Sequence, residues 1–263
     1  MKLAAFDIDG TLIPLQTHHL DEKTVDAIQK LKKKHIYTVI ATGRQYMTVH
    51  PEIRELCFDY YLCANGSCIN DSLGKTIVKS EISKEEVSSL TKDFIELGCP
   101  IMFRYEEGGV DANPDVCVGT FSKIFWPAEM QKTEVKPARA KIAEGELPFG
   151  AMCHIETQHK PYLEKRHPGL DFTITGNGAT CDITVKGTDK GTALKKLAAY
   201  LDVSIEECIA FGDDNNDELL LKAAGVAVAM GNAPEHLKQI ADHVTADSAD
   251  LGVVKGLRHY GLI

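Results

Sequence analysis

Two aspartates follow the first apolar stretch of the chain, at the point where a buried strand should end. Asp7 and Asp9 come directly after residues 3–6, Leu-Ala-Ala-Phe. Like charges repel, and a carboxylate taken out of water costs several kcal/mol unless a cation or hydrogen-bond donors meet it. The sequence therefore predicts a cationic or donor-rich partner for this acid pair.

Three further segments place polar residues straight after an apolar stretch. With the first, the four segments are Asp7-Ile8-Asp9-Gly10-Thr11, Thr42-Gly43-Arg44, Asn65-Gly66 and Gly212-Asp213-Asp214-Asn215-Asn216-Asp217. Open α/β sheets bind ligands at the carboxyl ends of their strands, so all four should converge on one rim. Lys190, at the start of a predicted helix, can reach the same rim.

The oxygen donors of this rim suit a magnesium ion. The carboxylates of Asp7 and Asp213, a backbone carbonyl near Asp9 and waters form an all-oxygen ligand set, which Mg²⁺ prefers. A metal ion also answers the repulsion between the acids. With Mg²⁺ and Lys190 nearby, Asp7 can stay ionised at neutral pH, as a nucleophile must.

These residues can transfer a phosphoryl group. Carboxylates act as covalent nucleophiles toward phosphorus and form an aspartyl-phosphate, and Asp7 is the candidate. Lys190 and the Thr42 hydroxyl would hold phosphate oxygens as the charge rearranges. Gly10 lets the chain turn sharply, so Asp9 can lie beside Asp7, protonate the leaving oxygen and later deprotonate the attacking water.

Six segments, taken in order, resemble the haloacid dehalogenase-like hydrolases, specifically the Cof-type phosphatases with an inserted α/β cap of the C2 type. They are Asp7 to Leu12, Ala41 to Arg44, Ala64 to Gly66, Lys190 to Leu194, Gly212 to Asp217 and Met230 to Ala233. The resemblance spans nearly the whole chain. One such motif alone would be weak evidence, whereas six in order are strong.

The resemblance implies the same roles as the chemistry: Asp7 is the nucleophile, Asp9 the acid and base, and Thr42 and Lys190 contact phosphate. The implied magnesium ligands are Asp7, the Asp9 carbonyl and Asp213, with Asp217 orienting Lys190 or a metal-bound water. The candidate phosphate- or substrate-binding residues are Thr42, Gly43, Arg44 and Asn216. Arg44 could instead pair with a core carboxylate. The family also implies a cap that opens and closes over the core.

Alternating apolar and amphipathic stretches predict the frame that positions these residues, a Rossmann-like, doubly wound parallel sheet. The expected strands are 2–6, 36–41, 59–64, 208–211 and 226–229, and the expected helices are 22–34, 44–56, 189–201, 216–224 and Pro234 to about Ala241. Asp21 is the expected N-cap of its helix, and Ser204 and Glu207 have capping-box spacing.

The pattern changes in the middle of the chain, where a helix and paired strands predict an inserted α+β domain. We expect it at 81–183, within a catalytic core made of 1–80 and 184–263. Its expected elements are a helix over 84–97 that Ser83 caps, strands 101–105 and 151–157, a helix over 159–167 and a hairpin over 172–185. The proline-broken stretch 112–151 holds Trp126 and shows no specificity signature.

Composition and charge limit the classes of partner. The net charge of −9 argues against a nucleic-acid footprint, and no run approaches the roughly 18 apolar residues of a membrane span. The N-terminus lacks the apolar stretch of a secretory signal. The eight cysteines include no CxxC pair, which disfavours zinc and is typical of thiols in the reducing cytoplasm.

The sequence thus predicts a cytoplasmic, Mg²⁺-dependent phosphatase acting on small phosphorylated metabolites, with sugar phosphates first. Two alternatives use the same residues: a non-enzymatic phospho-acceptor or sensor, and a phosphomutase. The physiological substrate and the choice between monomer and homodimer are not readable from the residues.

Overall fold

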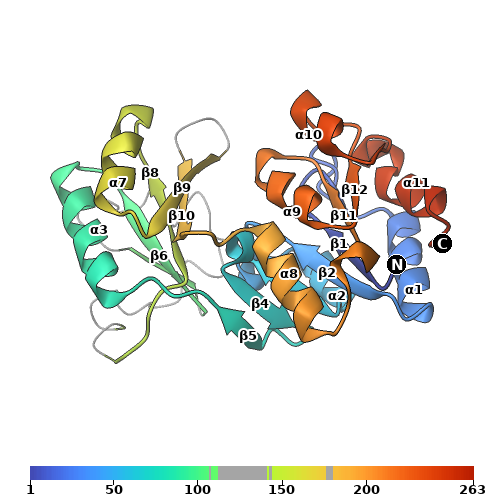
Figure 1. Ribbon diagram of the computed structural model, residues 1–263, viewed down its shortest axis with the longest axis horizontal. Coiled ribbons are helices and arrows are strands. Elements are labelled where there is room, and N and C mark those ends of the chain that lie inside the picture. The colour runs from blue at the N-terminus through green and yellow to red at the C-terminus, as the bar shows by residue number, and fades with distance from the viewer. Residues whose placement is uncertain (107, 112–140, 142–143, 176–179) are drawn as a thin grey trace. The chain divides into compact units, whose positions relative to one another are not determined.

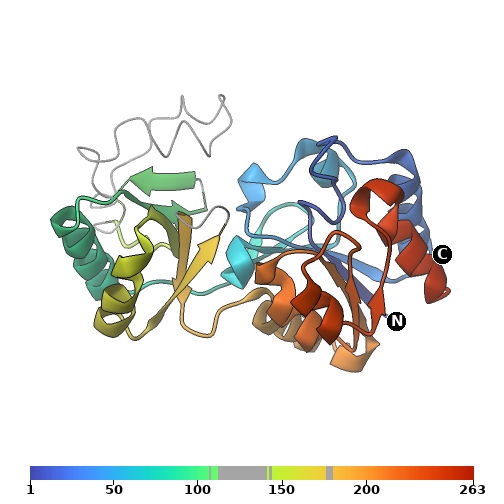
Figure 2. The same ribbon diagram turned by 90° about the horizontal axis from the view of Figure 1, so that it is seen from above.

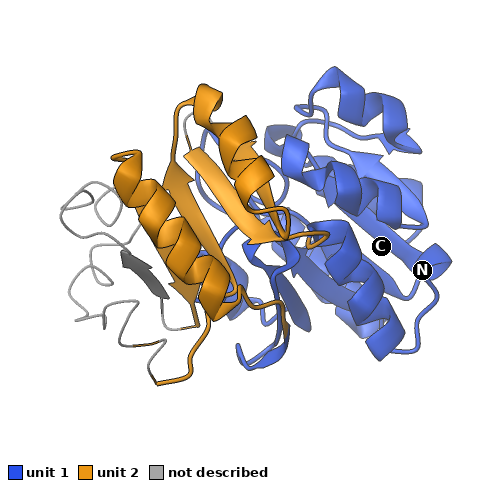
Figure 3. Cartoon of the chain, turned by 60° about the vertical axis from the view of Figure 1, so that its left-hand side comes forward, with its two compact units in different colours: residues 1–78, 189–263 blue, residues 79–188 orange. Residues whose placement is uncertain are grey.

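The computed structural model describes residues 1–106, 108–111, 141, 144–175 and 180–263 and divides into two compact units. The core unit comprises residues 1–78 and 189–263, and the inserted unit comprises residues 79–188 (Figure 3). The expected domain limits of 80/81 and 183/184 lie two and five residues from these limits.

An eight-stranded sheet forms the centre of the core unit, in the order β13-β12-β11-β1-β2-β3-β4-β5 (Figure 1). The six strands β13 to β3 in this order are parallel, as predicted, and β4 runs antiparallel to β3. Their bounds are β1 Leu3–Phe6, β2 Tyr37–Ala41, β3 Tyr60–Cys63, β4 Cys68–Asp71, β5 Thr76–Lys79, β11 Cys208–Gly212, β12 Val226–Ala229 and β13 His243–Val244. Because β1 pairs with both β2 and β11, the loop after β1 lies between the loops after its two neighbours.

Helices cover both faces of this sheet (Figure 2). They are α1 Glu22–Lys33, α2 Pro51–Glu55, α8 Lys190–Tyr200, α9 Glu218–Ala223, α10 Glu235–Ile240 and α11 Gly252–His259. Leu3 and Ala5 share one hydrophobic core with residues of α8, α9 and α10. Phe6 points to the other face and stacks on Phe211, against which Gly256 of α11 packs. Burial on both faces explains why β1 is apolar at every position.

Two predicted helices are shorter than the sequence pattern suggested. The helix expected over 44–56 is wrong, because that segment forms a 3-10 turn over Tyr46–Thr48 and the short α2. Pro51 forces His50 into an extended conformation, which ends any continuous helix there. The helix expected over 216–224 begins instead with a 3-10 turn, η6 Asn215–Asp217, before α9.

The predicted caps have mixed outcomes. Asp21 does cap α1, with its side chain accepting a hydrogen bond from the Lys23 amide at 2.7 Å. The capping box expected at Ser204 is wrong, because the Ser204 hydroxyl bonds to Glu206 rather than to a backbone amide. A capping box does form, but it joins Asp214 and Asp217 at η6.

The inserted unit is an α+β unit, as predicted, with an antiparallel sheet in the order β7-β6-β8-β10-β9. Its elements are α3 Lys84–Glu96, β6 Ile101–Tyr105, β7 Gly108–Asp111, β8 Gly150–His154, α7 Lys160–Arg166, β9 Leu170–Thr175 and β10 Thr180–Val185. Ser83 caps α3 as expected. Phe94 of α3 and Leu163 of α7 are buried with Phe103 of β6 in one core. Trp126 and the turn of the predicted hairpin, residues 176–178, lie outside the described residues.

Cys63, Cys153, Cys181 and Cys208 are buried thiols. Among the helices that the structure describes, none is both long and apolar enough to cross a bilayer.

Gly191 allows the close approach of α8 to α9. A Cβ atom at this position would lie 2.1 Å from the carbonyl oxygen of Leu219 and 3.0 Å from the Cβ atom of Ala223. We expect Gly191→Ala to lower the free energy of unfolding by about 1–3 kcal/mol through overpacking, although alanine is the better helix former. The matched control is Gly169→Ala, where a Cβ atom would meet no atom within 4 Å. Urea denaturation followed by circular dichroism measures both, and an unchanged midpoint for Gly191→Ala would contradict the close packing.

Candidate active site

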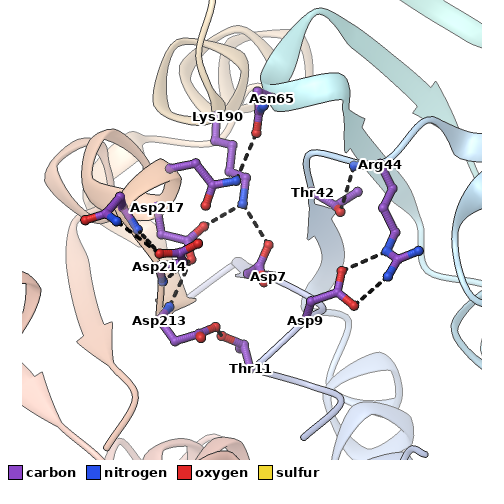
Figure 4. Close-up of polar contacts among 12 residues, drawn as sticks. Asp7, Asp9, Thr11, Thr42, Arg44, Asn65, Lys190, Asp213, Asp214 and Asp217 are labelled. Atoms are coloured by element: carbon purple, nitrogen blue, oxygen red, sulfur yellow. Dashed lines mark hydrogen bonds and ion pairs between the residues drawn. The ribbon is translucent and has the colours of Figure 1, made fainter. Parts of the chain in front are cut away.

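The loops that follow β1, β2, β3 and β11 meet at the carboxyl edge of the core sheet, where hydrogen bonds connect their side chains (Figure 4). The loop after β12 joins them through Asn232, whose side chain donates to Asp213. All four polar segments singled out in the sequence contribute to this cluster, and Lys190 reaches it from the start of α8. Residues from distant parts of the chain therefore form one site within the core unit.

Lys190 lies at the centre of the site, with its side chain fully buried. Its Nζ atom donates to Oδ1 of Asp7 at 2.7 Å and to Oδ1 of Asp217 at 2.6 Å. Helix α8 begins at this lysine because Asp189 caps it, accepting from the amide of Thr192 at 2.8 Å. The cap fixes the point from which the lysine enters the site.

Asp217 anchors both the lysine and the loop after β11. While Oδ1 accepts from Lys190, Oδ2 accepts from the backbone amides of Asp213 and Asp214, at 2.9 and 3.1 Å. Both oxygens of this fully buried carboxylate are thus engaged. Asp217 shapes the turn that brings Asp213 to the rim, while Asp214 is exposed and takes part in the capping box.

Asp213 lies against the loop that follows β1. Its Oδ1 atom accepts from the hydroxyl of Thr11 at 2.6 Å, and its Oδ2 atom accepts from the side-chain amide of Asn232 at 3.1 Å. Gly10 has a φ of +93°, and a Cβ atom there would lie 2.1 Å from Oδ2 of Asp213. Glycine is required at this position for both its conformation and its lack of a side chain.

The described carboxylates of this cluster outnumber its buried cation. Burial raises the pKa of Asp7 well above its ordinary value, although Lys190 partly offsets the effect. Burial likewise raises the pKa of Asp213 to about 7, even though the bond from Thr11 acts in the opposite direction. Burial alone would lower the pKa of Lys190, but Asp217 and Asp7 outweigh it and the pKa is raised. At neither aspartate does the positive charge of Lys190 fully offset burial.

Asp7, Asp213 and Asp217 fit a divalent cation. One carboxylate oxygen from each lies within 4.8 Å of those of the other two. An all-oxygen set with surplus negative charge is the kind of donor set that hard divalent cations bind. The shortage of positive charge and the oxygen ligands therefore both favour a divalent cation at this position.

Asp9 and Arg44 form a second ion pair beside the first. The Nε and Nη2 atoms of Arg44 each donate to one oxygen of Asp9 at 2.7 Å, which raises the pKa of the arginine. The pairing with a carboxylate, one of the two roles expected for Arg44, is thus present, and the contact with a phosphate or substrate oxygen stays a prediction. The side chains are 42% and 43% exposed, so solvent weakens the pair and substrate can reach it.

The rest of the rim is made of Thr42, Gly43, Asn65 and Asn216. The Thr42 hydroxyl oxygen accepts from the amide of Arg44 at 3.1 Å, which holds the turn after β2. The side-chain amide of Asn216 donates to Oδ1 of Asn65 at 3.1 Å. A Cβ atom at Gly43 would lie 3.2 Å from that oxygen, so glycine leaves room for the amide pair.

The sequence reading assigned no role to Thr11 or Asn232. Thr11 lies inside the first polar segment, but nothing local shows that its hydroxyl meets Asp213, 202 positions away. Asn232 follows the apolar strand β12, the same position that marked the other segments. That position, and the resemblance of Met230 to Ala233 to a family segment, were the signals that Asn232 lies at the rim.

Residues 4–257 match the sequence model of the haloacid dehalogenase-like hydrolase family. The chain belongs to the haloacid dehalogenase-like hydrolases. A 5-amino-6-(5-phospho-D-ribitylamino)uracil phosphatase of Bacillus subtilis is 30% identical, and the alignment covers all of this chain and 96% of that one. An HMP-PP phosphatase of Yersinia pseudotuberculosis is 29% identical over 90% of this chain and 86% of its own.

Solved structures of haloacid dehalogenase-like phosphatases share the fold. One from Bacteroides thetaiotaomicron superposes with a TM-score of 0.85 and 29% identity, covering all of this chain and 96% of that one. A subclass IIB sugar phosphatase superposes with a TM-score of 0.82 and 28% identity, covering both chains completely. This haloacid dehalogenase-like hydrolase is a Cof-type phosphatase, a hydrolase of phosphate monoesters. Phosphatases of the family generally use a divalent metal ion, which the acidic group of this site fits.

The raised pKa of Asp213 predicts an unusual pH dependence of stability in the metal-free protein. A carboxyl whose pKa rises on folding, here from 3.8 to about 7, binds its proton more tightly in the folded state. Stability is therefore fully present below the unfolded pKa and is lost as the pH rises through the folded one. With a chelator present, the free energy of unfolding should fall with pH across this interval, and Asp213→Asn should flatten the fall.

Each unit of pKa corresponds to about 1.4 kcal/mol, so the flattening should reach the kcal/mol scale. Denaturant titrations over a pH series measure it. The exposed Asp26 on α1 supplies a control, because Asp26→Asn should leave the fall nearly unchanged. Parallel curves for wild type and Asp213→Asn would show that Asp213 is not the group responsible.

Proposed function

We propose that this phosphatase is magnesium-dependent and hydrolyses small phosphorylated metabolites, sugar phosphates foremost, through an aspartyl-phosphate on Asp7. One observation carries the proposal: the buried Lys190 bridges Asp7 and Asp217 at a rim that also holds Asp213. A lysine beside a carboxylate nucleophile can keep it ionised and can also meet the incoming phosphate charge.

The reaction has two steps. In the first, a carboxylate oxygen of Asp7 bonds to phosphorus, the ester oxygen leaves with its electron pair, and Asp9, which enters this step protonated, gives that oxygen its proton. In the second, Asp9 takes a proton from water, whose oxygen attacks phosphorus and releases inorganic phosphate from Asp7. Asp9 thus returns to its starting protonation state, and a single carboxyl serves both steps.

The carboxylates of Asp7 and Asp213, with the backbone carbonyl of Asp9, would hold the magnesium ion. When bound, the ion supplies positive charge that offsets repulsion between the carboxylate nucleophile and the phosphate dianion. Asp217 has both oxygens engaged by Lys190 and backbone amides. We therefore assign Asp217 chiefly to positioning the lysine and the loop.

The remaining rim residues would receive the phosphate oxygens and the acid. We assign Lys190, the Thr42 hydroxyl, the Gly43 backbone and the Asn216 amide to the phosphate. Arg44 is assigned to orienting Asp9 in the ionised form that takes a proton from water, since both of its oxygens then accept from the guanidinium. The exposure of this pair leaves Asp9 accessible to the leaving group.

The proposed substrate class has support from the relatives, whose named substrates share a phosphate group on a small metabolite but differ in the rest of the molecule. A site built for the phosphate and the ester oxygen alone suits such variety. The buried thiols suit a reducing compartment, and we propose a cytoplasmic location.

Removing the nucleophile tests the proposal most simply. Asp7→Asn should lower the rate of phosphate release from a sugar phosphate in Mg²⁺ by about a thousandfold or more, because the amide cannot attack phosphorus. Asp59→Asn is the matched control: this carboxylate accepts from Thr38 at the opposite edge of the same sheet. Circular dichroism checks the fold of both variants. A folded Asp7→Asn protein with more than a tenth of wild-type turnover would exclude the mechanism.

Asp9→Asn should slow the release of leaving groups that need a proton more than the release of those that do not. A sugar alkoxide needs a proton, so its release should slow by about 10²–10⁴-fold. Nitrophenolate leaves without a proton, so a stopped-flow burst from p-nitrophenyl phosphate should persist and then stall at the phosphoenzyme. Equal losses for both substrates would argue against Asp9 as the acid.

A further inference from the structure

We propose that Asn232, with Thr11, is a positioning residue that holds Asp213 in the orientation needed to bind the divalent cation and so sets the affinity of the site for it. The inference rests on the proposed function, because the cation is that of the proposed phosphatase. It assigns a role to the loop after β12, which the mechanism above does not use.

The side chain of Asn232 connects three separate segments. Its Nδ2 atom donates to the carbonyl oxygen of Gly10 at 2.9 Å and to Oδ2 of Asp213 at 3.1 Å. Its Oδ1 atom accepts from the backbone amide of Ser248 at 3.1 Å, in the 3-10 turn η7 Ser248–Asp250. An asparagine amide has two N–H groups, and here each has a separate acceptor.

Asn232 and Thr11 hold the two ends of one carboxylate. Thr11 donates to Oδ1 of Asp213 and Asn232 donates to Oδ2, so rotation of the carboxylate would break one bond or both. Each carboxylate oxygen has further lone-pair capacity, which remains for a metal ion. Both donors are neutral, so they orient Asp213 without cancelling the charge that attracts the cation. A lysine or arginine in either place would compete with the metal.

The side-chain amide of Asn232 also fixes the backbone beside Asp9. The amide of Gly10 donates to the carbonyl of Ile13 at 2.8 Å, which orients the peptide unit that includes the Asp9 carbonyl. Asn232 fixes the next peptide unit through the Gly10 carbonyl. Gly10 has a positive φ, and a glycine without hydrogen-bond partners would sample many other backbone conformations. Asn232 therefore contacts one proposed metal ligand and stabilises the loop that offers another.

A positioning role predicts a change in metal affinity that a merely structural tie would not produce. Partners that orient metal ligands typically change metal affinity by about 10–100-fold when removed. Asn232→Ala in the full chain, stripped of metal, should therefore bind Mg²⁺ about 10–100-fold more weakly by isothermal titration calorimetry. The Mg²⁺ concentration for half-maximal activity should rise by the same factor, while the rate at saturating Mg²⁺ should stay within about threefold.

Matched variants isolate the side-chain amide and the hydroxyl. Gln239→Ala removes an exposed amide on α10 and should bind Mg²⁺ as wild type does. Thr11→Val removes the other donor and should weaken binding on the same scale, whereas Thr11→Ser keeps a hydroxyl and should restore it. Thr11→Val also decides the question if Asn232→Ala does not fold.

Asp213→Asn separates failure of this inference from failure of the proposed function. If wild type binds no Mg²⁺, both fail. If wild type binds Mg²⁺ and Asp213→Asn does not, but Asn232→Ala and Thr11→Val bind within twofold of wild type, the positioning role is overturned and the proposed metal site stands. Weakened binding in both donor variants, with Thr11→Ser restored, supports it.

Discussion

A buried lysine between two carboxylates is the interaction on which the site depends. Lys190 is fully removed from solvent, and a buried charge is tolerated only when paired and hydrogen-bonded. Its bonds to Asp7 and Asp217 require the start of α8 and the loops after β1 and β11 to meet at one point. Because β1 pairs with β11 in parallel, the backbone of the sheet already brings the loops after these two strands side by side.

Asp213 adds a third buried carboxylate to this cluster. Lys190 already donates to two carboxylates, and the donors that the described part of the chain places at the two oxygens of Asp213 are the neutral Thr11 and Asn232. Burial then raises its pKa to about 7, so the folded protein without metal binds this proton more tightly than the unfolded chain does. A cluster of this kind lowers stability at neutral pH and gains it back when a cation binds. The surplus negative charge therefore lowers the free energy of unfolding at neutral pH, and binding of a divalent cation would restore it.

Much of this arrangement was predictable because parallel sheets place loop residues by a simple rule. A polar residue directly after a buried apolar strand lies at the carboxyl edge, and the rule located Asp7, Asp213 and the turn after β2. Local patterns failed where a single residue overrode them, as Pro51 did in the helix expected over 44–56. Local patterns also do not show which of two distant groups a side chain will contact. Arg44 and Asp9 are 35 positions apart, so the sequence predicted either their ion pair or a contact of Arg44 with a phosphate or substrate oxygen.

Calorimetry of Mg²⁺ binding in buffers of different ionisation enthalpy tests the central claim, that the site lacks positive charge which a divalent cation supplies. Metal ions bind deprotonated ligands, so binding releases the protons that the carboxylates hold. We expect Mg²⁺ binding to release protons at about pH 6 and far fewer at about pH 8.5, where Asp213 is already ionised. Binding without proton release at the lower pH, or no binding at either, would contradict it.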